Sequence, residues 1–171
     1  YTQHHSNEKV TLTADIHSDK HNCNTAVLDV FSPCGKLAAS KSIPLNNTDH
    51  DFITIDIENP QLWWANGYGE QPLYKCKIRL ETNGITTDEH TQKIGLRTLT
   101  ISQDSDQWGE EFCFKLNGRK IFAMGANYIP EDQIVSKCTE KRTRYLLEQC
   151  KKANFNFIRV WGGGYYPNDS F

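Results

Sequence analysis

The chain has 171 residues and a formal net charge of −2, and 37% of its residues are hydrophobic while 23% are charged. Nineteen Lys and Arg residues against 21 Asp and Glu leave no basic field, so we expect no nucleic-acid partner. No stretch approaches the roughly 18 uninterrupted apolar residues of a membrane span, and the first residues lack the layout of a signal peptide. The composition therefore predicts an ordinary globular protein with no membrane partner.

Cysteines and histidines give no metal signature. The six cysteines form no CxxC pair and fit no zinc template, so we expect separate, unpaired thiols. The six histidines show no ligand-like grouping, and we expect neither a metal nor a cofactor. Two glycosylation sequons, at Asn46 and Asn168, are compatible with a secreted protein. The compartment stays open, with the cytoplasm slightly favoured.

Alternation of apolar and polar residues predicts half-buried strands from residue 9 to about 102. In the strand expected from Tyr74, Cys76 falls on the inward face and is predicted to be a buried thiol. The pair Asn83-Gly84 between two alternating runs is a strong hairpin signal. The expected strands are Val10–Ile16, Thr25–Phe31, Lys36–Ile43, Ile53–Ile57, Tyr74–Leu80, Ile85–Lys93 and Leu96–Ser102. Such short antiparallel strands predict an immunoglobulin-like β-sandwich over residues 1–102.

The pattern changes after residue 103. A hairpin is expected around Asn117-Gly118, with its second arm running into residues 125–130. A helix from Thr139 to Ala153 is expected, with Thr139 as its N-cap. The mostly apolar run Phe155–Trp161 then predicts a buried strand. Strand, helix and strand form a βαβ unit with a parallel sheet, so residues 103–171 are interpreted as the opening of a truncated α/β domain.

Arg159 is the most informative charged residue, because it lies inside an apolar run where an unpaired charge is costly. One interpretation is structural: the guanidinium reaches water or caps a carbonyl at the strand end. The other is functional: Arg159 and Trp161 share one face and point into the mouth of a parallel barrel, where active sites collect. For Gly162–Gly164 the alternatives are a tight turn that needs positive φ, or close approach of a ligand.

Adjacent Trp63 and Trp64 lie in a long loop that is rich in Gly and Pro. They are either a surface on which a sugar ring stacks or an anchor that packs against a neighbouring domain. No Ser-His-Asp or Cys-His arrangement has supporting context in this sequence.

Four segments in chain order together resemble glycoside hydrolase family 2, and within it the β-mannosidases. They are Trp63–Tyr74, Lys93–Arg97, Phe114–Pro130 and Asn154–Gly164. The resemblance implies a mainly β chain: an immunoglobulin-like sandwich over 1–102 and the truncated βαβ opening of a catalytic (β/α)8 barrel over 103–171. Gly162–Gly164 favour the mannosidases, because related β-galactosidases and β-glucuronidases usually carry a His soon after the Arg.

The resemblance also implies a function, that of a retaining exo-glycosidase that cleaves terminal β-mannosides with two glutamates. Neither glutamate falls in this chain, which is therefore not expected to be catalytic alone. Arg159 would hold the nucleophile's carboxylate, Trp161 would form a wall of the sugar subsite, and Asn127 and Asp132 would lie near the barrel mouth. The alternatives are a β-galactosidase or β-glucuronidase of the family, or a non-catalytic carbohydrate-binding or scaffold module. Carbohydrate is the expected partner of the full-length enzyme, and the truncated barrel segment is expected to self-associate.

Overall fold

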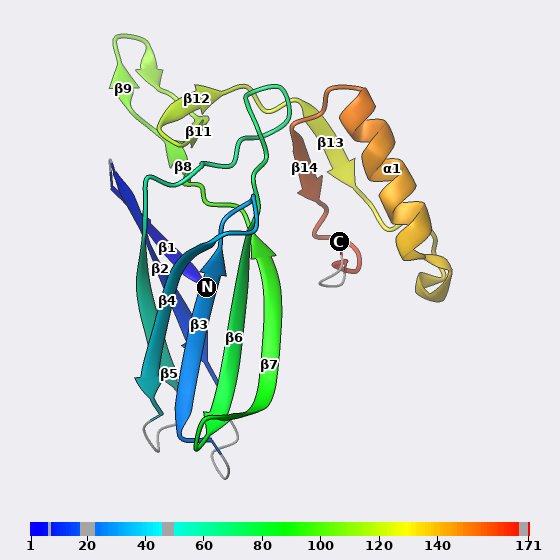
Figure 1. The fold of residues 1–171 in the computed structure, drawn as a ribbon. Coiled ribbons are helices and arrows are strands. Elements are labelled where there is room, and N and C mark those ends of the chain that lie inside the picture. Colours follow the sequence, from blue (N-terminus) through cyan, green and yellow to red (C-terminus); the bar gives the residue numbers. More distant parts are fainter. Residues whose placement is uncertain (7, 18–22, 46–49, 168–170) are drawn as a thin grey trace. The chain divides into compact units, whose positions relative to one another are not determined.

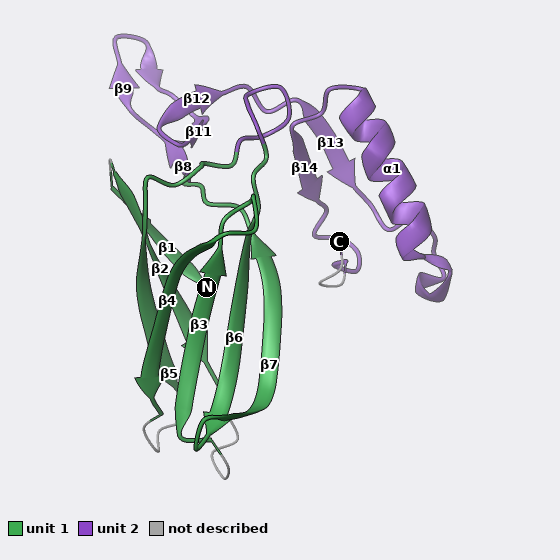
Figure 2. Ribbon diagram, viewed as in Figure 1, with its two compact units in different colours: residues 1–63, 71–98 green, residues 64–70, 99–171 purple. Residues whose placement is uncertain are grey.

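The computed structural model describes residues 1–6, 8–17, 23–45, 50–167 and 171. The chain divides into two compact units: residues 1–63 with 71–98 form the first, and residues 64–70 with 99–171 form the second (Figure 2). The two sequons at Asn46 and Asn168 lie outside the described residues. In the described part of the chain, no helix is long and apolar enough to span a membrane.

The first unit consists of antiparallel strands in two sheets, one in the order β1-β2-β5 and the other in the order β4-β3-β6-β7 (Figure 1). The strands are β1 Thr2–His5, β2 Lys9–Ile16, β3 Thr25–Phe31, β4 Leu37–Pro44, β5 Asp51–Glu58, β6 Tyr74–Thr82 and β7 Ile85–Ile94. This arrangement confirms the predicted mainly β sandwich. β1 was not predicted from the sequence; its four residues are all polar, and it is held by its pairing with β2.

Alternation along the strands produces the core of the first unit. β5 alternates buried and exposed residues over all of its eight positions, and β2 buries every second residue from Val10 to Ile16. Because side chains of a strand alternate between the two faces of a sheet, these residues all point inward. The buried apolar residues of the two sheets, together with Leu96 from the segment after β7, form one cluster: Val10, Leu12, Ala14, Ile16, Ala26, Leu28, Val30, Ile53, Ile55, Ile57, Tyr74, Cys76 and Leu96.

Two Asn-Gly pairs close the predicted hairpins. Asn83 has φ 52° and Gly84 has φ 79°, and the flanking Thr82 and Ile85 are register partners. Positive φ at both central residues defines a type I′ turn, whose twist matches that of paired strands. Asn117-Gly118 repeats this geometry, with φ values of 49° and 78°. Both hairpin predictions are confirmed.

The prediction of one strand over Leu96–Ser102 is wrong in its first half, because β8 begins at Leu99. The carbonyl of Leu96 accepts the backbone N–H of Trp63 at 2.9 Å, and the backbone N–H of Arg97 donates to Oε1 of Gln3 at 3.1 Å. These backbone groups are therefore committed to loop contacts and not to a strand ladder. β8 pairs with β11 and belongs to the second unit.

The second unit holds the predicted strand–helix–strand segment. β13 and β14 pair in parallel, and α1 lies between them in the sequence (Figure 1). The small β9–β10 hairpin was not predicted from the sequence. The elements are β8 Leu99–Ser102, β9 Ser105–Asp106, β10 Gly109–Glu110, β11 Cys113–Leu116, β12 Arg119–Ile121, β13 Gly125–Tyr128, the 3₁₀ turn η1 Val135–Lys137, α1 Glu140–Lys152 and β14 Phe157–Val160.

Helix α1 begins and ends as its sequence predicts. The hydroxyl of the N-cap Thr139 accepts the backbone N–H of Arg142 at 3.3 Å, which satisfies one of the free donors of the first turn. Glu140 stands in the first turn, and Lys151 and Lys152 stand in the last, so these charges complement the helix dipole.

All six cysteines are free thiols in the structure. Cys76 and Cys34 are the extremes in solvent exposure among them. Cys76 is fully buried in β6, and desolvation raises the pKa of its thiol to about 11. Cys34 is exposed in the turn before β4, and a hydrogen bond with Ser32, followed by one from the backbone of Lys36, lowers its pKa.

We expect alkylation at pH 8 to modify Cys34 first and Cys76 last, because the thiolate is the reactive form and a thiol of pKa about 11 is about 0.1% ionised there. Mass spectrometry of iodoacetamide-treated peptides measures both rates in one sample. Unfolding in denaturant is expected to make the two rates similar. Rapid native labelling of Cys76 would contradict its burial.

Candidate functional site

Arg159 and Asn127 face each other across the parallel β13–β14 pair. They are register partners, and a guanidinium N–H of Arg159 donates to Oδ1 of Asn127 at 3.2 Å. Each lies next to the last residue of its strand, and both are exposed. Partners in register point to the same side of a sheet, so this face carries one cation and one amide at its carboxyl-terminal edge.

Trp161 and Asp132 follow these strands. The backbone N–H of Trp161 donates to the carbonyl of Tyr128 at 2.9 Å, which extends the strand pairing by one residue, and its indole is 40% exposed. Asp132 Oδ1 accepts the backbone N–H of Ile134 at 2.9 Å and so closes the turn after β13. Of the four predicted site residues, the structure therefore joins Arg159 to Asn127. Among the described residues, no hydrogen bond links Trp161 or Asp132 to that pair.

The glycine run after Trp161 forms a turn, but none of its three residues has positive φ. The expectation that this turn needs positive φ is therefore wrong. Close packing explains two of the glycines: a Cβ at Gly163 would lie 2.2 Å from the indole of Trp161, and one at Gly164 would lie 2.9 Å from the ring of Pro130. The bare backbone here accommodates side chains of the chain itself.

Glu131 is a buried carboxylate that the sequence analysis missed. Its side chain is 1% exposed, and its Oε1 accepts hydrogen bonds from the hydroxyls of Tyr128, at 3.2 Å, and Thr143. The Nε of Arg142 lies 3.4 Å from Oε2. Burial, together with the Glu131 charge, raises the pKa of Tyr128. This cluster links the end of β13 to α1. The one sequence feature that could have indicated Glu131 is its position as an acidic residue directly after a Pro at the end of a strand.

A cavity of about 440 Å³ lies between β13, α1 and the segment after β14. Tyr128, Thr143 and Leu147 contribute to its wall, with Tyr165 and Tyr166. Tyr128 follows Asn127 in the strand and therefore points to the opposite face of the sheet. The cavity is thus on the helix side of β13 and β14, and the Arg159–Asn127 pair is on the other side.

The loop 64–70 belongs to the second unit, where two of its side chains make specific contacts. The amide of Asn66 donates to the carbonyls of Lys151, at 3.3 Å, and Phe155, at 3.2 Å, and so joins the end of α1 to the entry of β14. The hydroxyl of Tyr68 accepts the backbone N–H of Phe122 at 3.0 Å. Asn66 was not singled out from the sequence, because nothing in its local pattern indicates partners so distant along the chain.

Trp63 and Trp64 are half-buried, and each packs against a glycine. A Cβ at Gly95 would lie 2.8 Å from the Trp63 ring, and one at Gly69 would lie 2.9 Å from the Trp64 ring. The guanidinium of Arg97 stands 4.6 Å from the centre of the Trp63 ring. These contacts cover part of both indoles with the chain's own atoms and favour the packing role over an open sugar platform.

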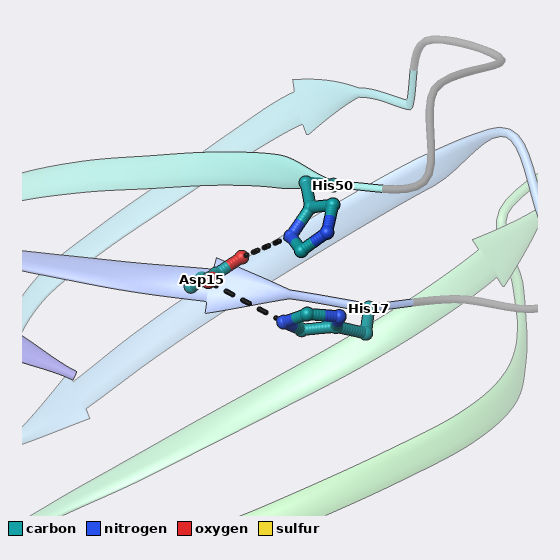
Figure 3. A group of neighbouring side chains, drawn as sticks. All are labelled: Asp15, His17 and His50. Atoms are coloured by element: carbon teal, nitrogen blue, oxygen red, sulfur yellow. Dashed lines mark hydrogen bonds and ion pairs between the residues drawn. The ribbon is translucent and has the colours of Figure 1, made fainter.

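The structure also groups two histidines that the sequence analysis had found to be without ligand-like neighbours. His17 and His50 both face the carboxylate of Asp15 (Figure 3). Strand pairing brings them together although they are far apart in the sequence, so local spacing does not reveal the cluster.

Comparison with known proteins places this architecture in a class. Residues 1–97 match the family model described as glycosyl hydrolases family 2. The chain is 32% identical over 167 residues to β-mannosidase B of Emericella nidulans, covering 98% of this chain and 20% of that relative. It is 39% identical over 119 residues to β-mannosidase B of Aspergillus terreus, covering 70% of this chain and 14% of that relative.

Solved structures agree with this assignment. The crystal structure of β-D-mannosidase from Dictyoglomus thermophilum aligns with a TM-score of 0.83 at 32% identity, covering 95% of this chain and 20% of that one. β-Glucuronidase of Parabacteroides merdae aligns with a TM-score of 0.74 at 20% identity, covering 95% and 20%, and this likeness shows the shared fold. The chain is thus a glycosidase-type protein segment in which a β-sandwich is followed by a strand–helix–strand segment. The chain belongs to glycosyl hydrolase family 2, and it spans 14% to 20% of the length of the relatives just named.

Proposed function

We propose that this chain is the immunoglobulin-like domain, residues 1–102, and the opening of the (β/α)8 catalytic barrel, residues 103–171, of a retaining exo-β-mannosidase. The observation that carries the proposal is the parallel β13–β14 pair, with Arg159 and Asn127 joined at 3.2 Å near its carboxyl-terminal edge. Active sites of parallel barrels collect at this edge. Relatives named β-mannosidase over nearly the whole chain support terminal β-mannosides as the substrates.

In this proposal Arg159 is a positioning residue. A retaining glycosidase uses two carboxyl groups about 5 to 5.5 Å apart, one as acid/base and one as nucleophile, and we assign neither to this chain. A guanidinium has five N–H donors, and Asn127 is its hydrogen-bond partner within the described residues. The remaining donors suit a carboxylate supplied by another part of the enzyme. Such a charge-assisted contact orients the nucleophile and keeps it ionised.

Trp161, Asn127 and Asp132 take supporting roles in the same site. The indole of Trp161, which is 40% exposed, forms a wall of the subsite for the terminal sugar. Asn127 fixes the orientation of the guanidinium from the neighbouring strand. Asp132 lies in the turn after β13, near the mouth of the barrel.

Two observations make the alternative functions less well supported than a β-mannosidase. A β-galactosidase or β-glucuronidase is disfavoured because Gly162–Gly164 occupy the place where the resemblance leads us to expect a His. A non-catalytic carbohydrate-binding or scaffold module is disfavoured because its platform, Trp63 and Trp64, packs against the chain's own glycines.

Self-association through residues 103–171 also stays a prediction. It is supported by exposed apolar side chains such as Phe112 and Phe122.

The test is kinetic and uses the full-length protein that carries this chain, with aryl β-mannoside, β-galactoside and β-glucuronide as substrates. We expect the β-mannoside to have the highest kcat/KM. Arg159→Gln is expected to lower kcat/KM by about 100-fold, in line with the loss of one preorganised charge-stabilising group. Because Arg159 lowers the pKa of the carboxylate that it holds, its removal is expected to move the acidic limb of the pH profile to higher pH.

The matched control is Arg144→Gln on α1, where an exposed arginine pairs with Glu140 at 3.3 Å. It is expected to leave both the rate and the pH profile unchanged, since surface pairs of this kind contribute little. Arg159→Lys keeps the positive charge but lacks the bidentate hydrogen-bonding geometry of a guanidinium, so its rate and pH profile are expected to lie between those of the unchanged protein and Arg159→Gln. Preference for another sugar, or an Arg159→Gln variant with unchanged rate and pH profile, would overturn the proposal.

A further inference from the structure

Asp15, His17 and His50 lie together because of strand register. β2 and β5 pair antiparallel, and the last register partners at this end are Ile16 and Asp51. His17 and His50 are the next residue on either side, so they face each other, with ring centroids 4.0 Å apart. Asp15 precedes His17 by two residues and projects from the same face of the sheet.

The two imidazoles converge on one carboxylate (Figure 3). Nε2 of His17 lies 3.3 Å from Oδ2 of Asp15, and Nδ1 of His50 lies 3.4 Å from Oδ1. Each residue offers one ligand atom, and the three atoms lie within 4.8 Å of one another. With zinc–ligand bonds of about 2.0 to 2.1 Å, neighbouring ligands of a tetrahedral ion are about 3.3 to 3.4 Å apart. Each nitrogen–oxygen distance is close to one edge of such a tetrahedron. The two distances involve different oxygens of Asp15, so the carboxylate would turn to offer one of them to the ion.

We propose that Asp15, His17 and His50 form a binding site for a divalent transition-metal ion, with Zn²⁺ as the representative ion. Two imidazole nitrogens and one carboxylate oxygen suit zinc and its borderline neighbours better than Ca²⁺ or Mg²⁺, which prefer oxygen ligands alone. The three side chains are all exposed, at 43%, 65% and 51% for Asp15, His17 and His50, so an ion can reach them from solvent and water can complete its shell.

The bound ion would act on the sandwich and not on catalysis. It would join the end of β2 to the start of β5, next to the buried pair Ile16 and Asp51. An ion that binds the folded chain and not the unfolded one raises the stability of the folded state by mass action. The inference is independent of the proposed glycosidase function.

The test is zinc titration of the 171-residue chain by calorimetry at pH 7.5, in a Cys34→Ser background because an exposed thiol such as that of Cys34 can compete for zinc. We expect one zinc ion per chain at the highest-affinity site, and a higher unfolding temperature when zinc is present. His17→Ala, His50→Ala and Asp15→Asn are each expected to weaken that binding by at least about 10-fold, since changes at outer-shell residues alone cost 10–100-fold.

The matched control is His90→Ala, which removes an exposed histidine from β7 in the other sheet. It is expected to leave the affinity and the zinc-dependent rise in unfolding temperature unchanged. Circular dichroism without zinc checks that each variant folds. If the chain binds no zinc at 100-fold excess, or if His17→Ala and His50→Ala bind as tightly as His90→Ala, the cluster is an ion-pair network only and the proposal is overturned.

Discussion

Gly125→Ala is expected to separate β13 from β14. Gly125 is the register partner of Phe157, and a Cβ at this position would lie 1.7 Å from the Phe157 carbonyl oxygen. A backbone oxygen in a paired strand cannot rotate away as a side chain can, so the strands must move apart. Overpacking usually costs 1 to 3 kcal/mol, and a backbone clash this close is expected to cost about 3 kcal/mol or more. Hydrogen exchange of the β13 and β14 amides measures this loss.

The control for this prediction is Gly162→Ala in the same unit. A Cβ at Gly162 has only the hydroxyl of Tyr166 near it, at 4.0 Å, and its φ is not positive. Exchange rates in β13 and β14 are expected to stay unchanged in this variant, and those of β2 and β3 to stay unchanged in both. Normal protection of β14 in Gly125→Ala would show that the parallel pairing is not as described.

Leu28→Ala is expected to destabilise the sandwich by about 2 to 5 kcal/mol, because it removes a fully buried side chain from the core and leaves a cavity. Leu28 lies in β3, which has a strand on either side in the sheet order β4-β3-β6-β7, so the backbone has little freedom to collapse around the gap. Urea unfolding, followed by circular dichroism, gives the change in the free energy of unfolding.

Leu37→Ala makes the same chemical change on β4, where the side chain is 57% exposed. Its effect is expected to stay within about 0.5 kcal/mol, as for most surface substitutions. Equal midpoints for the two variants would mean that the described core does not hold the sandwich together.

The sequence by itself determined the local structure wherever one physical rule acts on neighbouring residues. Period-two alternation placed Ile53, Ile55 and Ile57 on a buried face, since a strand allows no other way to bury all three. Asn-Gly pairs fixed both type I′ turns, because these residues tolerate positive φ at low cost. Thr139 marked the start of α1, because its hydroxyl satisfies a backbone donor of the first turn.

The tertiary structure decided what depends on residues distant along the chain. Register set His17 opposite His50, and the fold brought the Asn66 amide to the carbonyls of Lys151 and Phe155. The burial of Glu131 likewise depends on α1 packing beside β13. Local periodicity predicts the direction in which a side chain points, but it does not predict which distant segment that side chain contacts. The free energy of such a contact arises only when both segments are in place.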